Sequence, residues 1–167
     1  GATWSIIDNI TPTPPAICGI DCVGTSTIYA CGAYFTSSAY IIKSTDSGAT
    51  WQHIDMGAYA AGLVEVLFVD ENTGYASGVG IESDVPEAPP VGGVILKTTD
   101  GGATWTQIYH TGIPGEYVWK MQILASNPNC MFGSVESVND LPGKLVRTLD
   151  NGATWTSHDV PDTDFKG

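Results

Sequence analysis

The sequence predicts an all-β protein, a β-propeller segment of about three four-stranded antiparallel blades. The tetrapeptide Gly-Ala-Thr-Trp recurs along the chain and ends at Trp4, Trp51, Trp105 and Trp155. A period of roughly 50 residues without helical patterning is typical of arrays of small β-sheets, above all propellers. The 20 glycines and 10 prolines among 167 residues suit many short strands joined by tight turns.

Each unit of the repeat predicts the same series of strands. The first is an apolar run, typical of an inner strand with both faces buried between blades, at 17–23, 63–69 and 118–124. A turn leads to a second short strand that ends in glycine, at 29–32, 75–78 and 130–133. A variable loop precedes the third strand, at 40–43, 94–97 and 144–147. The repeated phrase then turns the chain into a fourth strand that starts at its tryptophan.

We expect one partial propeller domain over residues 1–167. Its parts are the outer strand of a preceding blade, three blades and the start of a next blade, at 1–10, 16–57, 63–110, 117–160 and 161–167. Closed propellers have about four to eight blades, so three do not close easily. The alternatives are a part of a larger propeller, a homo-oligomer whose copies complete a ring, or a monomer with exposed flanks.

The phrase before each tryptophan predicts a hairpin corner. Its aspartate can accept hydrogen bonds from backbone N–H groups two or three residues on, and its glycine supplies a backbone angle that other residues avoid. The Ser or Thr before the aspartate can bond across the turn, and the tryptophan ring packs over it. The structural residues expected in these corners are Ser44, Asp46, Gly48, Trp51, Thr98, Asp100, Gly102, Trp105, Thr148, Asp150, Gly152 and Trp155.

The three full copies, S/T-x-D-x-G-x-T-W at 44–51, 98–105 and 148–155, resemble the Asp-box, also called the BNR repeat. The phrases at 73–78 and 97–105 look most like bacterial repeats that resemble the photosystem II stability/assembly factor. More distant resemblances are to the sortilin ectodomain, sialidases and xyloglucan-cleaving hydrolases. The resemblance implies a propeller whose Asp-boxes lie on the outer rim of each blade, away from any active site.

The charge and hydropathy of the chain limit the classes of partner that we expect. The chain carries 18 acidic and 6 basic side chains, a formal net charge of −12, so we expect no binding to nucleic acid. No apolar run approaches the roughly 18 residues needed to span a bilayer, so we expect no membrane insertion. The chain has no signal peptide or initiator Met and opens in mid-motif, which indicates a processed product or a piece of something longer. We expect an extracellular, periplasmic or cell-surface location.

Arginines and carboxylates bear on hydrolase chemistry. The resemblance to sialidases implies a cluster of arginines for the substrate carboxylate, but this chain has only Arg147, in the slot that Lys43 and Lys97 fill in the other repeats. A sialidase is therefore disfavoured. A glycosidase needs two carboxylates about 5–10 Å apart. Two loops that interrupt the repeat hold candidates, which are more simply interpreted as solvated acidic loops: Glu82, Asp84, Glu87, Glu136 and Asp140.

The cysteines predict a disulfide rather than a metal site. Cys22 and Cys31 lie on successive strands of one hairpin, so we predict a Cys22–Cys31 bridge, with Cys18–Cys31 as the alternative. Alignment of the repeats also allows Cys18 and Cys22 to be buried hydrophobes. No metal site or cofactor is expected, because the histidines follow their tryptophans at irregular offsets, at His53, His110 and His158.

The leading functional hypothesis is a non-enzymatic, secreted or surface propeller module for binding or assembly, with a protein or glycan as partner. The alternative is a carbohydrate-binding or glycoside-hydrolase propeller fragment that uses Tyr117, Trp119 and the acidic loops. It requires an exposed Trp119, whereas the alignment of Trp119 with Val64 and Cys18 predicts burial between blades. A third hypothesis is a structural spacer without a ligand.

Overall fold

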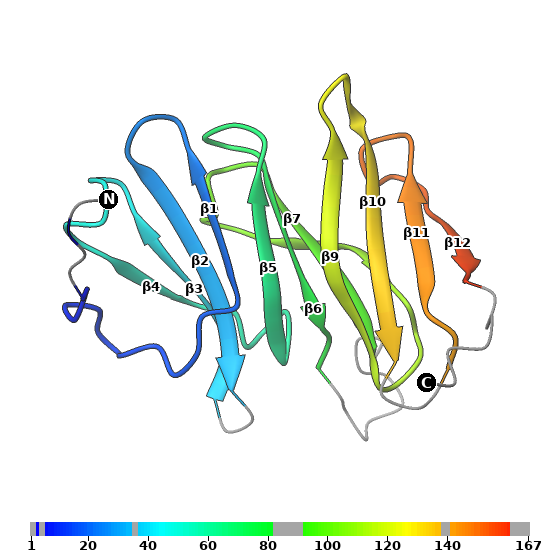
Figure 1. The fold of residues 1–167 in the computed structure, drawn as a ribbon, viewed down its shortest axis with the longest axis horizontal. Helices are drawn as coiled ribbons and strands as arrows, with labels where there is room; N and C mark the ends of the chain where they lie inside the picture. Colours follow the sequence, from blue (N-terminus) through cyan, green and yellow to red (C-terminus); the bar gives the residue numbers. More distant parts are fainter. Residues whose placement is uncertain (1–2, 4–5, 35–36, 82–91, 138–140, 161–167) are drawn as a thin grey trace.

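The computed structural model describes residues 3, 6–34, 37–81, 92–137 and 141–160. Within these ranges the chain forms three four-stranded antiparallel sheets and no helix, so the predicted all-β fold of propeller blades is confirmed (Figure 1). In the same residues there is therefore no helix long and apolar enough to cross a membrane.

Each sheet follows chain order from its inner to its outer strand. Blade 1 contains β1 Gly19–Val23, β2 Thr27–Tyr34, β3 Ser37–Ser44 and β4 Gln52–Asp55. Blade 2 contains β5 Gly62–Phe68, β6 Gly74–Val79, β7 Gly93–Thr98 and β8 Thr106–His110. Blade 3 contains β9 Glu116–Leu124, β10 Asn127–Ser137, β11 Lys144–Thr148 and β12 Thr156–Asp159.

The inner strands β1, β5 and β9 lie side by side and run in the same direction (Figure 1). Contacts between β1 and β5 and between β5 and β9 bring the blades together along this line. The arrangement leaves one apolar cluster between each pair of neighbouring blades, because strand side chains alternate between the two faces of a sheet. Burying one large aliphatic or aromatic side chain there stabilises the fold by about 1.5–3 kcal/mol.

The core consists of three clusters. The cluster between blades 1 and 2 contains Tyr29, Cys31, Ile41, Met56, Leu63, Phe68, Leu96 and Trp105. The cluster between blades 2 and 3 contains Tyr75, Ile95, Val118, Met121, Met131, Val135 and Val146. The third lies on the outer face of blade 1, where Ile10 covers Ala30, Tyr40 and Ile42.

The segment 6–10 takes the place of a neighbouring strand beside blade 1 but forms no strand itself. A Cβ added to Gly48 would lie 3.9 Å from Ile7 Cδ1, and one added to Gly152 would lie 2.7 Å from Ile108 Cδ1. Ile7 thus contacts the first corner as Ile108 of β8 contacts the third. The outer strand of a preceding blade expected at 1–10 remains a prediction, and 161–167 lies outside the described residues.

The register of β10 differs from the alignment that the sequence suggests. Aligning the glycines would place Gly133 level with Gly78, but Gly133 pairs with Val146 as Ala76 pairs with Leu96. The residue level with Tyr29 and Tyr75 is therefore Phe132. An irregularity between Asn127 and Met131 absorbs the shift, and sequence spacing alone does not reveal it.

The predicted Cys22–Cys31 bridge is wrong for this structure, in which all four cysteines are free. Cys22 pairs with Ile28 and Cys31 pairs with Gly19, so the two cysteines sit roughly 10 Å apart along the hairpin. The alternative Cys18–Cys31 bridge is not formed either. Cys31 is buried, and burial raises the pKa of its thiol to about 12. Cys18 and Cys22 are exposed, not buried hydrophobes.

Candidate functional site

The three repeated phrases form identical hairpin corners, here called corner 1 (44–51), corner 2 (98–105) and corner 3 (148–155). In corner 2, Thr104 donates from its N–H to Asp100 Oδ1 at 2.9 Å and from its hydroxyl to Asp100 Oδ2 at 2.6 Å. Thr98 Oγ1 donates to Asp100 Oδ1 at 2.8 Å and accepts from Gly102 N at 2.9 Å. Corners 1 and 3 repeat each bond. The side chain of each corner aspartate thus accepts from the residue four positions on, whereas the sequence predicted a residue two or three positions on.

These bonds hold the corner carboxylates in their charged form. The pKa of Asp46, Asp100 and Asp150 is lowered to about 2, first by the threonine hydroxyl and then by the threonine N–H. Each corner tryptophan closes the turn by donating from Nε1 to the glycine carbonyl. Because both carboxylate oxygens already accept internal hydrogen bonds, the corners act as scaffold.

Corners 2 and 3 are also the places where the preceding blade attaches. Tyr29 OH and Lys43 Nζ both donate to the Gly101 carbonyl of corner 2, at 3.0 and 2.8 Å. A shallow pocket of about 160 Å³ lies at this contact between blade 1 and corner 2. In the next junction, Tyr75 OH donates to Asn151 Oδ1 at 2.5 Å and Lys97 Nζ donates to the Asn151 carbonyl at 3.4 Å.

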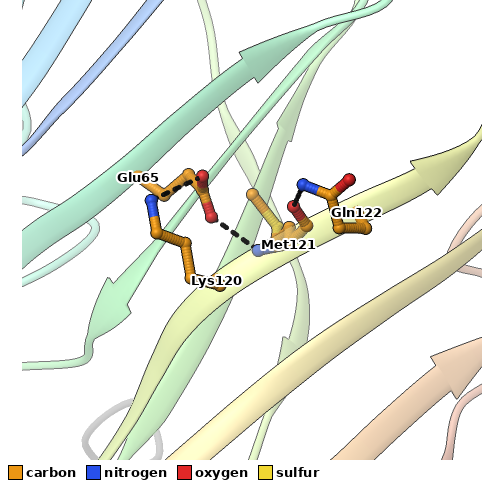
Figure 2. Close-up of polar contacts among 4 residues, drawn as sticks. All are labelled: Glu65, Lys120, Met121 and Gln122. Carbon is orange, nitrogen blue, oxygen red and sulfur yellow. Dashed lines mark hydrogen bonds and ion pairs between the residues drawn. The ribbon is translucent and has the colours of Figure 1, made fainter.

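Carboxylates on the inner strands link neighbouring blades a second time. Asp21 Oδ2 of β1 accepts from Phe68 N of β5 at 2.6 Å. Glu65 of β5 accepts from Met121 N of β9 at 2.5 Å and forms an ion pair of 3.1 Å with Lys120 (Figure 2). The Lys120 side chain stays 67% exposed, so its ion pair faces solvent. The Asp21 link fixes β5 against β1, and the Glu65 links fix β9 against β5.

A buried ion pair supports blade 3 from within. Glu116, at the start of β9, is completely buried and pairs with Lys144 at the start of β11. Among the described residues, the second carboxylate oxygen, Oε2, finds no hydrogen-bond partner. Such a pair is costly to bury and harmful to break from one side. Sequence reasoning missed it, because nothing in the pattern separates Glu116 from a turn residue.

The bulged residue of β9 is an exposed aromatic side chain. Lys120 pairs with Ser134 and Val118 pairs with Val135, so Trp119 is an extra residue in β9. Trp119 is 41% exposed and stacks on Tyr117 with ring centroids 6.0 Å apart. The expected burial of Trp119 between blades is therefore wrong. We call Tyr117 and Trp119 the aromatic platform.

The aromatic platform lies among charged side chains. Glu136 of β10 is exposed and pairs directly with Tyr117, while Lys120 follows Trp119 in β9. The other acidic loop candidates, Glu82, Asp84, Glu87 and Asp140, lie outside the described residues. Lys120 and Glu65 were missed from the sequence, although a charge within each apolar run was the available signal. Among the described residues, no group of three His, Cys, Asp or Glu is placed to hold a metal ion.

No family model matches the sequence, and no curated protein matches it. Solved structures do. A GH74 enzyme of Niastella koreensis superposes with a TM-score of 0.66 at 24% identity, covering 94% of this chain and 25% of that one. YCF48 bound to D1 peptide gives a TM-score of 0.56 at 21% identity, covering 87% of this chain and 41% of that one. YCF48 from Cyanidioschyzon merolae gives 0.57 at 22%, covering 89% and 38%. The chain thus spans less than half of each of these neighbours, and the likeness shows the propeller fold.

Proposed function

We propose that this protein is a non-enzymatic propeller module that binds a partner through the aromatic platform of blade 3. The observation that carries the proposal is the exposed, stacked Trp119 on a strand whose backbone Glu65 anchors. Exposed aromatic rings on rigid strands provide large contact areas at little entropic cost, which is why they dominate binding hot spots.

A protein segment is the partner that we propose first. Glu136 pairs with Tyr117 in the sheet, and Lys120 follows Trp119 and is 67% exposed beside Glu65. A peptide with alternating apolar and charged side chains therefore matches the rings and these charges. One structural neighbour is described as bound to a peptide, which supports this class of partner for the fold.

Apart from Glu136, which is exposed beside Tyr117, several of the described carboxylates already have structural tasks. Glu65 binds a backbone N–H and Lys120, and Glu116 is buried against Lys144. The corner aspartates bind their own turns. This use of the carboxylates supports a binding role, and we also propose that the corners are Asp-boxes, since one bonding pattern recurs in all of them.

Glycan binding is the second candidate, favoured by the same platform. Aromatic faces stack on sugar rings, and one structural neighbour is a GH74 enzyme. The affinity of a glycan would depend on the ring of Trp119 and not on the charges of Glu136 and Lys120. The affinity of a peptide of matching charge would depend on the ring and on the charges.

The test is a binding screen of the purified chain on a peptide array and a glycan array. We expect binders that disappear for Trp119→Ala and persist for Leu124→Ala, a matched control because Leu124 is another exposed side chain of β9. A peptide that also weakens for Glu136→Gln supports the first candidate. Binders that ignore Trp119→Ala would refute the aromatic platform as the site.

Location outside the cytoplasm stays part of the proposal. A Cys22–Cys31 bridge would have supported an oxidising compartment, but the structure has free cysteines instead. Fractionation of cells that express the protein from its own gene tests the location directly. Recovery in the cytoplasmic fraction would contradict an extracellular, periplasmic or surface site.

A further inference from the structure

We propose that the outer edge of β4 binds an extended peptide, which inserts one apolar side chain into the pocket between blade 1 and corner 2. No residue of the aromatic platform takes part, so the inference goes beyond the proposed function. It rests on a bulge that distinguishes β8 from β4 and on the outward backbone groups of β4.

The pocket lies between one face of blade 1 and corner 2. Blade 1 contributes Lys43, Gln52 and Ile54 to its lining, and corner 2 contributes 100–103. Its volume is about 160 Å³. An apolar cavity of about 150 Å³ is large enough for a benzene-sized molecule, so this pocket has room for one apolar side chain.

Corner 2 covers only part of the face of blade 1 on which it docks. Tyr29, Lys43 and Gln52 pair in one row across β2, β3 and β4. The Gly101 carbonyl of corner 2 accepts from the first two of these side chains, at 3.0 and 2.8 Å. The pocket begins beyond Lys43, and it therefore reaches the outer strand β4.

The corresponding place in blade 2 is filled. β8 contains a bulge, in which Ile108 is the extra residue. A Cβ added to Gly152 of corner 3 would lie 2.7 Å from Ile108 Cδ1. The next residue, Tyr109, packs its ring against Trp155 with centroids 5.0 Å apart. Two side chains of β8 thus pack against corner 3.

β4 has no such bulge. Its register with β3 is regular, and Ile54 takes the position that Tyr109 has in blade 2. A Cβ added to Gly102 of corner 2 would first meet Tyr29 and Trp105, at 3.5 and 3.6 Å, and not Ile54. The pocket is therefore the space that a bulged residue and an aromatic ring occupy in blade 2.

The backbone of β4 is open on its outer side. β4 is the outermost strand of blade 1 and pairs in the described part of the chain with β3 alone (Figure 1). Met56 N, directly after β4, donates to the Ala39 carbonyl at 2.8 Å. Hydrogen bonding alternates along an antiparallel pair, so His53 and Asp55 turn their N–H and C=O groups outward.

The segment 6–10 lies on the other face of blade 1. Its Ile10 packs against Ile42, and strand side chains alternate, so Ile42 points away from the pocket. Gln52 and Asp55, at the two ends of β4, are exposed. The pocket and the edge are therefore open to a partner at the same time.

An extended peptide is the occupant that satisfies both features. Its backbone can pair with the outward groups of β4, as when a strand is added to the edge of a sheet. A peptide residue opposite Gln52 or Ile54 then points to the face of the pocket. We expect that residue to be apolar and its neighbour to be basic, because Asp55 and Asp100 are exposed and the chain has a net charge of −12.

The experiment is an NMR titration of the nitrogen-15-labelled full chain with synthetic hexapeptides of the form Thr-Thr-Lys-Xaa-Thr-Thr. Xaa is glycine, alanine, valine, leucine or phenylalanine. We expect the affinity to rise at least about tenfold from glycine to leucine, because the pocket buries the side chain. The amide signals of His53 and Asp55 should shift on binding.

Filling the pocket should remove the preference for leucine over glycine. Ala103→Leu does this from corner 2, and Ile54→Tyr does it from β4 with the residue that blade 2 has there. Ala153→Leu is the matched control, because Ala153 is the equivalent exposed residue of corner 3, and it should keep the preference. Circular dichroism checks that each variant is folded.

Two N-methylated forms of the leucine peptide test the pairing with β4. One is methylated at the leucine and the other at its two neighbours. A strand added in either direction uses the N–H groups of only one set, so one form should lose binding and the other should keep it. Trp119→Ala should leave the titration unchanged. Leucine and glycine peptides that bind alike, an Ala103→Leu chain that keeps the preference, or binding that needs Trp119 overturns the proposal.

Discussion

The corners are the same in all three repeats, whereas the inner strand β9 differs from its counterpart in the preceding repeat. The corners keep the same residues and the same hydrogen bonds in every copy, and their polar atoms are used internally. The inner strands β5 and β9 keep a bulge at one position, but blade 2 places Val64 there and blade 3 places Trp119. The repeated residues thus build the scaffold, and the binding site that we propose lies where the same backbone carries a different side chain.

The largest effect on stability is expected when a corner tryptophan is removed. Trp105 is only 5% exposed and joins the cluster between blades 1 and 2, so Trp105→Ala should lower the free energy of unfolding by about 3–5 kcal/mol. Trp51→Ala should cost less, because Trp51 is half-buried. Urea denaturation checks both variants, and equal losses would contradict the ranking by burial.

A change inside blade 3 should have the next largest effect. Lys144→Met leaves the buried Glu116 carboxylate without its partner, and we expect a loss of about 3 kcal/mol. The double variant Glu116→Gln with Lys144→Met should recover most of that loss, because it removes the charge as well. The same urea experiment measures both, and a harmless Lys144→Met would show that the pair is not needed.

Acid should loosen all three corners together. The folded pKa of Asp46, Asp100 and Asp150 is about 2, below the usual value of 3.8. A depressed carboxyl pKa stabilises the fold above the unfolded pKa, so this stabilisation is full above pH of about 4 and is lost as the pH falls toward 2. Carbon-13 NMR titration of the carboxyl groups measures the pKa values, and three aspartates that titrate near 3.8 would refute the bonding pattern.

The smallest effect on stability is expected at the aromatic platform. Trp119→Ala should lower the free energy of unfolding by less than Trp105→Ala does, because the Trp119 side chain is 41% exposed and that of Trp105 is 5% exposed. Hydroxyl-radical footprinting with mass spectrometry should oxidise Trp119 faster than Trp105. Equal protection of the two rings would show that Trp119 is as buried as Trp105, and the aromatic platform would then not be an exposed surface.

The sequence predicted the blades well because strand order and corners depend on local signals. Turn residues, apolar runs and the aspartate of each corner act over a few residues, so their spacing is visible in the chain. The positions of Asp46, Asp100 and Asp150 in the corners are of this kind.

Features set by the pairing between strands were predicted poorly. A shift within β10 moved Phe132 level with Tyr75, a bulge turned Trp119 outward, and the hairpin register separated Cys22 from Cys31. Each depends on an inserted or unpaired residue that leaves the local pattern intact. The alternative that Cys18 and Cys22 are buried hydrophobes is also wrong, because an apolar run does not tell which inner strand has neighbours on both sides.

The central claim is that the scaffold and the binding surface are separate. It is tested most directly by measuring affinity and unfolding midpoint together for Trp119→Ala and Asp100→Asn, with the binder found by the array screen and at a temperature where both variants are folded. Trp119→Ala should lose binding and keep the wild-type midpoint, while Asp100→Asn should keep binding and melt at a lower temperature. If Asp100→Asn loses binding while folded, or Trp119→Ala retains full affinity, the claim is contradicted.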